Sequence, residues 1–577
     1  MSRGHLQRTA ADYYRSRHVP ERLEEALNVI YHRGPEDVYG QLADYFADLS
    51  APPLISGVRG RKVLDGGGKV TLEAEVACRV RTADKRVCVA AVSIDPATLL
   101  TGETTDDADR WRLESVETAI RWIQDCIGPA LKGMEPSKQT NIDQLLSEYF
   151  KVKKQEDEQR REAESDTAVS PPGPILPAAS SPIPSKKKAS AKGKKAAASE
   201  KPPPPAEPEE PAIRGALAMA AVSLAVVKSS AALRDLPLYS YIAALKQQQP
   251  PPELAIPTPL ISLLSCAKSS PGKLKLMKEI MVIPQPGTAM AKSLDLASSL
   301  QTQIQKQVEM QSKSGSVIRS VSPLGCLVLT CDRLDQPLEL IRDACEQLGL
   351  ELGTNVYLAI NCAAHELMDY NKGRYEVVSG TWKSPDEMVD LYVDLINRHA
   401  AIVALLDPLR KEDRQQWESL GNSVGSRCYL MADVASKSVS ELLQGSNAPD
   451  CSSPILKLTN ETTVSDLLTA VRMIEEEKRP TVVGCTSEEC SEDSIVDLAV
   501  GLGVRFIKLG GLLRGERTAK YNRLIAIEED LTHSGTLGRQ KEFEFPTFGT
   551  DPESLSCPEE SSEEDKDGLK VSLLPLA

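Results

Sequence analysis

Short apolar runs and amphipathic segments alternate along residues 255–545, about half of this 577-residue chain. Nine runs have the composition of buried strands: Pro259–Leu264, Glu279–Ile283, Cys326–Leu329, Val356–Asn361, Ala401–Leu406, Cys428–Ala432, Pro454–Leu458, Pro480–Gly484 and Val504–Leu509. Helical patterns lie between most of them, at Gln336–Leu348, Pro385–Arg398, Asp413–Leu420, Val464–Lys478 and Ser494–Gly501. Repeated strand–helix spacing is typical of a closed parallel α/β barrel. An open doubly wound sheet is the alternative, but no glycine-rich dinucleotide fingerprint follows a run, so the barrel is favoured.

The segment before the barrel mixes strand and helix patterns. Between Lys62 and Val80, apolar and polar residues alternate as in a half-buried strand, and Cys88–Val92 is a candidate return strand. The helical patterns of this part of the chain lie at 114–133, 141–151 and 216–233, the last rich in small apolar residues. We therefore expect one αβ domain made of residues 58–151 and 213–248.

Two segments lack the apolar residues of a folded core. Residues 152–212 are dominated by Lys, Glu, Ser, Ala and Pro, and residues 546–577 form an acidic tail. Neither can bury enough apolar surface to offset the entropy lost on ordering, so we predict a disordered insertion and a disordered tail. Contact between the lysine runs of the insertion and phosphate or acidic partners is an alternative, but an extended, solvated linker is favoured.

Charge and hydropathy limit the classes of partner. Lys and Arg number 68 against 82 Asp and Glu, a formal net charge of −14, which argues against nucleic acid or an anionic membrane as the main partner. No run approaches the ~20 apolar residues of a membrane span, and Met1–His5 lacks the apolar core of a signal peptide. The thirteen cysteines have no paired metal-ligand spacing, so we expect reduced thiols in a cytoplasmic protein.

Residues 10–52 contain two short amphipathic patterns. Leu23, Leu27 and Ile30 share one helical face, and after Gly34-Pro35 the apolar residues recur at Val38, Leu42, Tyr45 and Leu49. Two such helices cannot close a hydrophobic core alone. We therefore expect this unit to pair with a second copy in a homodimer.

Polar residues at the carboxyl ends of barrel strands face the active-site mouth in folds of this kind. In this chain they are Glu279, Asn361, Asp407, Asp433, Lys457 and Lys508. Lys457 and Lys508 each place an ammonium group in an apolar strand, where desolvation and a neighbouring cation would lower the lysine pKa and produce a general base. The alternative is an edge lysine that discourages sheet pairing, but two such lysines on late strands favour a functional role.

Several motifs are similar to those of one enzyme family. They are Leu64-Asp65 with Thr71-Leu72-Glu73, Ala216–Leu238, Leu276-Met277-Lys278-Glu279, Asn361–Glu366, Asp407-Pro408, Ile507–Gly511, Gly515-Glu516-Arg517, Lys520–Arg523 and Ile527-Glu528-Glu529. Together they make residues 58–545 resemble the enolases. The long insertion and the N-terminal helices are most similar to a divergent, sperm-associated member of that family. The resemblance implies an αβ lid domain followed by an eight-stranded, TIM-like α/β barrel.

The resemblance also implies the glycolytic reaction of that family, the dehydration of 2-phosphoglycerate to phosphoenolpyruvate. In that reaction a lysine removes the C2 proton, two magnesium ions hold the resulting enediolate, and a carboxylic acid protonates the departing hydroxyl. By resemblance, Lys457 takes the place of the base, whereas Lys508 and Glu279 bind the substrate.

Other positions depart from the family pattern. Leu324 stands where the general acid is expected, and Asn361, Leu406 and Val434 stand where three carboxylates ligate magnesium. Asp433, next to Val434, would restore one ligand after a shift of one residue. Because magnesium prefers anionic oxygen, Asn361 and Asp433 are weak ligand candidates.

Two further segments lack family groups. Cys485-Thr486-Ser487 aligns with the His-Arg-Ser that grips phosphate, and no Ser-Gly-Ala-Ser lid loop is found around Ile94–Ala97. The favoured hypothesis is therefore a structural pseudoenzyme with little or no turnover. The alternative is an active glycolytic enolase (phosphopyruvate hydratase) with Lys457 as base. A second acidic pair converging on Lys457 in the folded protein would favour that alternative.

The N-terminal unit carries a second resemblance. Val19–Leu23, Pro35–Tyr39 and Leu42–Phe46 resemble the docking-and-dimerisation domain of type II kinase regulatory subunits and axonemal proteins. That family forms an antiparallel four-helix dimer whose apolar groove binds a partner's amphipathic helix. The resemblance implies that an anchoring helix tethers this chain to a scaffold in a cilium or the sperm flagellum.

Overall fold

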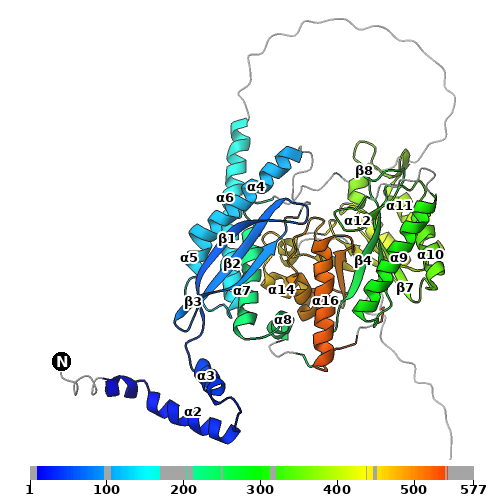
Figure 1. Cartoon of the computed structure of the whole chain (residues 1–577). Coiled ribbons are helices and arrows are strands. Elements are labelled where there is room, and N and C mark those ends of the chain that lie inside the picture. The colour runs from blue at the N-terminus through cyan, green and yellow to red at the C-terminus, as the bar shows by residue number, and fades with distance from the viewer. Residues whose placement is uncertain are drawn as a thin grey trace, which may run out of the picture.

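The structure, a computed structural model, describes residues 10–95, 105–168, 205, 212–247, 251–311, 320–436, 438–445, 451–539 and 542–543. Figure 1 shows three parts: a pair of N-terminal helices, an αβ domain with a three-stranded sheet, and a larger domain built around a barrel. The helix pair lies apart from the other two parts, which pack against each other.

The N-terminal helices α2 (Val19–Arg33) and α3 (Val38–Asp48) form a hairpin. Pro20 lies in the first turn of α2, where a backbone N–H is not needed, and Gly34 ends that helix in the left-handed conformation with φ 57°. The Asp37 side chain caps the amino end of α3 by accepting a backbone hydrogen bond.

This hairpin buries only part of its apolar surface. On α2, Ala26 and Ile30 are buried, whereas Leu23 and Leu27 are 45% and 57% exposed. Of the predicted apolar face of α2, only Ile30 is therefore covered within one chain. Further exposed apolar side chains lie nearby at Tyr31, Val38, Tyr39 and Leu49.

The αβ domain has an antiparallel sheet in the order β1 (Leu54–Leu64), β2 (Val70–Val80) and β3 (Ala83–Val92). Its helical elements are α4 (Thr105–Trp122), the π-helical turn Ile123–Ile127, α5 (Gly128–Leu131), α6 (Gln139–Ala168) and α7 (Leu217–Leu233). The alternation predicted for β2 places Leu72, Ala74 and Val76 in the core. Because α7 is rich in alanine and serine, it packs closely against β2 and β3 and is itself almost wholly buried.

Helix α8 (Leu238–Gln247) packs against α15 (Ser494–Leu502) of the barrel domain. A Cβ atom on Gly501 of α15 would lie 2.5 Å from the carbonyl oxygen of Tyr239. Only glycine permits the two helices to approach so closely.

Helix α6 is longer than the sequence pattern predicts. The predicted disordered insertion begins at residue 152, but α6 continues to Ala168, so the first part of that segment is helical. Ion pairs between successive turns, such as Lys153–Glu156 at 2.7 Å, stabilise this charged stretch. Low apolar content excludes a buried helix but not an exposed one. The rest of the predicted disorder, for most of 169–211 and for the tail 546–577, lies outside the described residues.

Eight strands close the barrel, in the order β4 (Thr258–Cys266), β5 (Met277–Pro284), β7 (Val356–Asn361), β11 (Ile402–Leu406), β12 (Tyr429–Ala432), β13 (Ser453–Leu456), β14 (Val482–Gly484) and β15 (Phe506–Gly510). β15 pairs with β4 and completes the ring, while the two-residue β6 (Leu327–Val328) pairs in parallel with Leu264 and Ser265 near the end of β4. The predicted fold class, an αβ domain followed by an eight-stranded barrel, is confirmed.

The prediction of an all-parallel barrel is wrong for one strand. β5 runs antiparallel to both β4 and β7. The link between β4 and β5 is short, and a parallel pair would need a crossover of a dozen or more residues. Hydrophobic periodicity does not encode strand direction, so the pattern alone did not show this.

The barrel helices are α9 (Met290–Gln311), α10 (Gln336–Leu348), α11 (Pro385–Arg398), α12 (Arg414–Val424), α13 (Val439–Leu443), α14 (Val464–Glu476), α15 and α16 (Gly515–His533). A small separate sheet contains β8 (Met368–Asp369), β9 (Arg374–Val378) and β10 (Thr381–Lys383), preceded by the 3-10 turn Ala364–Leu367. Capping boxes fix the starts of α11 and α14: Ser384 pairs with Glu387, and Thr463 with Asp466.

Aromatic side chains close the end of the barrel at which the parallel strands begin. Tyr357, Tyr429 and Phe506 lie at the starts of β7, β12 and β15. Phe543, from the C-terminal segment, packs onto them, with its ring centroid 4.9 Å from that of Tyr357 and 6.4 Å from that of Phe506. The opposite end, at which the parallel strands finish, faces the αβ domain.

Within the described residues, no single helix has both the length and the apolar content needed to cross a membrane. Only α7 and α8 taken together pass on length and composition, and the pair is bent by 102°. The twelve cysteines in the described part of the chain are thiols rather than disulfides, and most are buried.

Candidate functional site

Six polar side chains meet where the parallel strands of the barrel finish. They are Ser262 of β4, Glu279 of β5, Asn361 of β7, Asp433 just after β12, Lys457 just after β13 and Lys508 of β15. Because β5 is antiparallel, Glu279 comes from the start of its strand, yet the register pairs it directly with Asn361. The structure thus brings together five of the six strand-end residues that the sequence singled out: Glu279, Asn361, Asp433, Lys457 and Lys508.

Glu279 is wholly enclosed, with none of its side chain exposed. Its carboxylate lies 2.9 Å from Lys508 Nζ and accepts hydrogen bonds from Ser262 Oγ at 2.6 Å and from Asn361 Nδ2 at 2.7 Å. Burial opposes ionisation, but Lys508 and these donors outweigh it and lower the pKa of Glu279 below its ordinary value. Burial also disfavours the Lys508 ammonium, but Glu279 and Asp433 raise the pKa of Lys508. The two residues form a buried ion pair.

Lys457 is held between two carboxylates. Its Nζ atom lies 2.7 Å from Asp433 Oδ1 and 3.2 Å from Asp95 Oδ2. Burial would lower the pKa of Lys457, but these two carboxylates raise it well above the ordinary lysine value. The expectation of a lowered lysine pKa is therefore wrong, because the nearest charges are anions and not a second cation.

Asp433 connects the two lysines. Besides its contact with Lys457, its other carboxylate oxygen lies 3.4 Å from Lys508 Nζ. Burial alone would raise the pKa of Asp433, but the two ammonium groups lower it far below its usual range. Charges of alternating sign therefore run without a break from Asp95 through Lys457, Asp433 and Lys508 to Glu279.

Asp407 has a structural role beside this cluster. Its buried carboxylate accepts backbone hydrogen bonds from Asp433, Val434 and Ala435, at 2.8, 2.9 and 3.1 Å. These bonds fix the turn after β12 and so the position of the Asp433 side chain. Burial and the neighbouring Asp433 raise the pKa of Asp407 above its ordinary value.

The cluster does not fit magnesium. Asn361 points its NH2 group at Glu279, while its oxygen accepts a hydrogen bond from Ala363 N at 3.1 Å, so it presents a donor to the cluster. Leu406 is wholly buried in the apolar barrel interior and offers no oxygen. Asp433, and not Val434, supplies the carboxylate at the end of β12, but that carboxylate is paired with lysines. Within the described residues, no group of three or more His, Cys, Asp or Glu is arranged to hold a metal ion.

The segment expected to carry the general acid is apolar and firmly held. Leu324 is 7% exposed, and its carbonyl oxygen accepts a hydrogen bond from Gly511 N at 2.7 Å. Gly325 follows with φ 76°, and a Cβ there would lie 3.1 Å from the carbonyl oxygen of Gly511. A hydrocarbon side chain has no proton to donate, so Leu324 cannot act as the general acid.

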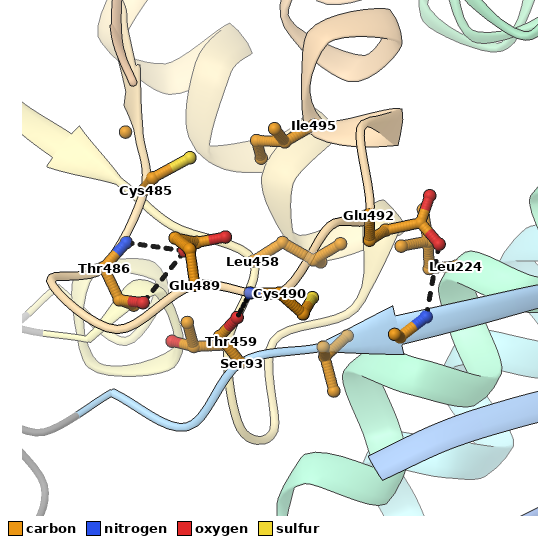
Figure 2. A pocket seen from close by; sticks show the side chains of 13 residues that line it. Ser93, Leu224, Leu458, Thr459, Cys485, Thr486, Glu489, Cys490, Glu492 and Ile495 are labelled. Carbon is orange, nitrogen blue, oxygen red and sulfur yellow. Dashed lines mark hydrogen bonds between the residues drawn. The ribbon is translucent and has the colours of Figure 1, made fainter. Parts of the chain in front are cut away.

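The loop after β14, residues 485–492, is acidic where the family pattern grips phosphate. It borders a pocket between the barrel and the αβ domain. Figure 2 shows Glu489 and Glu492 on the wall of this pocket. The residues that line it, all within the described chain, include no lysine, arginine or histidine. Carboxylates without an adjacent free cation repel phosphate.

Each acid of this loop pairs with a cation from another element. Glu488 pairs with Arg112 of α4 and lies 2.9 Å from Lys69, Glu489 lies 3.2 Å from Lys520 of α16, and Glu492 lies 2.7 Å from Lys228 of α7. Two of the three acids therefore bind the αβ domain to the barrel. In this structure the loop therefore joins the two domains through ion pairs.

Sequence reasoning gave no site role to Asp95, Ser262 or Arg517. Arg517 is buried and donates hydrogen bonds to the carbonyl oxygens of Leu509, Thr486 and Ser487, so it holds two site loops together. It lies in the Gly515-Glu516-Arg517 motif, which signalled the family but no function. For Asp95 no local signal exists, because its partner Lys457 lies 362 residues away in the chain.

Comparisons with known proteins agree with this architecture. A family model described as "Enolase, N-terminal domain" matches residues 55–158, and one described as "Enolase, C-terminal TIM barrel domain" matches residues 253–544. The chain is 55% identical to "Enolase 4" of Xenopus laevis, over 96% of each chain. It is 46% identical to "Enolase 4" of Homo sapiens, over 96% of this chain and 92% of that one. It is 24% identical to "Enolase" of Methanopyrus kandleri, over 86% of this chain and all of that one.

The family models fall on the αβ domain and the barrel, and their span takes in every side chain of the cluster around Lys457 and Lys508. The similarity to the vertebrate proteins extends over nearly the whole chain. This chain belongs to the enolase family.

Proposed function

We propose that this enolase-family protein has little or no turnover of 2-phosphoglycerate and serves as a structural component of the sperm flagellum or another cilium. One observation carries the proposal. The side chains that remain from the family site, Lys457, Lys508, Glu279 and Asp433, pair with one another in a closed ionic cluster.

Catalysis by the family mechanism needs three things that this cluster lacks. A base must be able to lose its proton, but the carboxylates beside Lys457 raise its pKa. The family generally uses magnesium, yet Asn361 and Leu406 offer no anionic oxygen, and Asp433 is engaged with lysines. A proton donor is needed for the leaving hydroxyl, and Leu324 has none.

Electrostatic stabilisation of the charged intermediate usually lowers the barrier of an enzymatic reaction more than any other single effect. The metal positions supply that stabilisation in the family reaction, and they are the positions most altered here. Loss of these groups therefore costs more than loss of any single substrate contact.

The experiment is a steady-state assay of phosphoenolpyruvate formation by the purified full chain at saturating magnesium. We expect no magnesium-dependent product above that formed by Lys457→Ala. Sustained magnesium-dependent turnover that Lys457→Ala removes would refute the proposal.

An active glycolytic enolase is the second candidate function, and one observation favours it. Asp433 and Asp95 converge on Lys457, so an acidic pair stands beside the group that would act as base. In this alternative Lys457 removes the C2 proton after substrate displaces one carboxylate, and Lys508 and Glu279 hold the substrate. The same steady-state assay separates the two candidates.

The helices α2 and α3 support the structural role. Leu23, Leu27, Val38 and Leu49 are each more than 40% exposed, and a helix pair of this size cannot stabilise itself alone. We propose that two copies pair through this apolar strip into a homodimer and that the dimer binds an amphipathic anchoring helix of a ciliary or flagellar scaffold protein. An apolar strip does not suit nucleic acid, which binds through basic surfaces.

A further inference from the structure

Asp95 reaches from the αβ domain into the mouth of the barrel. It follows β3 by three residues, and its carboxylate lies 3.2 Å from Lys457 Nζ at the end of β13. Both side chains are mostly enclosed, with 14% of Asp95 and 13% of Lys457 exposed. This is a direct ionic contact between the two domains at the centre of the candidate site.

The segment that carries Asp95 is fixed by the loop after β14. Ser93 Oγ accepts a hydrogen bond from Cys490 N at 2.9 Å, as Figure 2 shows, and Glu492 accepts one from Ala91 N at 3.2 Å. Glu492 is itself anchored by Lys228 at 2.7 Å. Two hydrogen bonds therefore hold residues 91–95 against the barrel domain, and the position of Asp95 is set by the fold.

Lys457 does not need Asp95 as a counterion. Asp433 already lies 2.7 Å from Lys457 Nζ, and Glu279 lies 2.9 Å from Lys508 Nζ, which gives each lysine one close carboxylate. Asp95 is a third carboxylate beside these two ammonium groups, and its contact gives Lys457 a second carboxylate. The Asp95 carboxylate therefore occupies the position in which an anionic ligand of Lys457 would bind.

We infer that Asp95 is an internal competitor for small carboxylate anions at the barrel mouth, because its own carboxylate occupies the free side of Lys457. Removing its charge leaves Lys457 with Asp433 alone and leaves the two lysines balanced by two carboxylates. The cluster then accepts a carboxylate ligand in the place of Asp95. This inference concerns binding and goes beyond the proposed function, since it holds whether or not turnover occurs.

The test is calorimetric binding of 2-phosphoglycerate to the full chain, with divalent cations removed by a chelator. We expect Asp95→Asn, which keeps the shape of the side chain, to bind at least tenfold more tightly than the wild type, a change of about 1.4 kcal/mol. The matched control is Asp84→Asn, which removes an exposed carboxylate of the same domain that lies 3.0 Å from Arg79. The control should bind as the wild type does.

A double variant assigns the gain to its site. Asp95→Asn combined with Lys457→Met should lose the added affinity, because the Lys457 ammonium group that would bind the ligand is then absent. If the asparagine variant melts at a lower temperature than the wild type, the same binding measurement is made on Asp95→Ser. The inference is overturned if neither Asp95 variant binds more tightly than the wild type, if no variant binds at all, or if the gain survives in the double variant.

Discussion

Replacing Lys508 by methionine tests whether the ionic cluster is a structural core. Lys508 is 5% exposed and faces Glu279, which is wholly buried, at 2.9 Å. Methionine keeps much of the volume of the lysine stem but removes the charge, so Glu279 loses its cation and Asp433 keeps only Lys457. Removing one partner of a buried ion pair leaves an uncompensated charge in a place that water does not reach.

The expected cost follows from that burial. Breaking a buried pair typically destabilises a protein by about 3–5 kcal/mol. For a domain of the size of the barrel, 1 kcal/mol corresponds to roughly 2 °C in the melting temperature, so we expect a decrease of roughly 6–10 °C. Lys292→Met on α9, which removes an exposed lysine, should change the melting temperature very little and serves as the matched control.

The assay is thermal unfolding followed by circular dichroism at several pH values. The pKa of Glu279 is lowered in the folded protein, so its ionised form contributes stability above its unfolded pKa and loses that contribution as pH falls. In Lys508→Met, Glu279 no longer has its cation. Protonation of Glu279 at low pH then removes the energetic cost of a buried, unpaired carboxylate. The difference in melting temperature between variant and wild type should therefore shrink as the pH falls. An unchanged or higher melting temperature for Lys508→Met at neutral pH would refute the idea that these pairs stabilise the fold.

Magnesium binding, residual turnover and the N-terminal dimer each give a further prediction. Magnesium should bind at least about tenfold more weakly than to a conventional enolase, because hard cations require anionic oxygen, and micromolar binding in calorimetry at this site would contradict the metal assignment. Any residual phosphoenolpyruvate formation should vanish in Lys457→Ala and persist in Leu324→Ala, and activity that survives loss of Lys457 would mean that another group is the base. A fragment of residues 10–52 should sediment as a dimer. Leu27→Asp should make the fragment monomeric, whereas the control Asn28→Asp, at the neighbouring exposed position, should leave it dimeric. A wild-type fragment that is monomeric at high micromolar concentration would remove the support for the proposed docking and dimerisation unit.

Much of the fold could be predicted because local patterns determine it. The helices Gln336–Leu348 and Pro385–Arg398 have the bounds that periodicity indicated, since a proline in the first turn and a change of apolar period mark their limits. The direction of β5 could not be predicted, because an alternating or apolar run has the same appearance in either direction. The helical start of the insertion was missed because a salt-bridged, exposed helix and a disordered linker share one composition.

The candidate site could likewise be predicted only in part. Its five residues could be named from strand ends and from family resemblance. Their ionisation could not, because it depends on which charges the fold brings together: Asp433 lies nearest to Lys457, and Asp95 adds a second carboxylate from the other domain. The sequence therefore indicated which groups meet at the barrel mouth, while the sign of the lysine pKa shift needed the three-dimensional arrangement of charge.

Exchange of the C2 proton of 2-phosphoglycerate in deuterated water is the most direct test of the account. Nuclear magnetic resonance follows this proton, and its loss reports abstraction by a base even when the later departure of hydroxide fails for lack of an acid at Leu324. With the full chain at saturating magnesium, we predict no exchange above that seen with Lys457→Ala, because Asp433 and Asp95 keep the Lys457 ammonium protonated. Exchange that is catalysed by the wild type and lost in Lys457→Ala would contradict this prediction and establish the barrel mouth as a working active site.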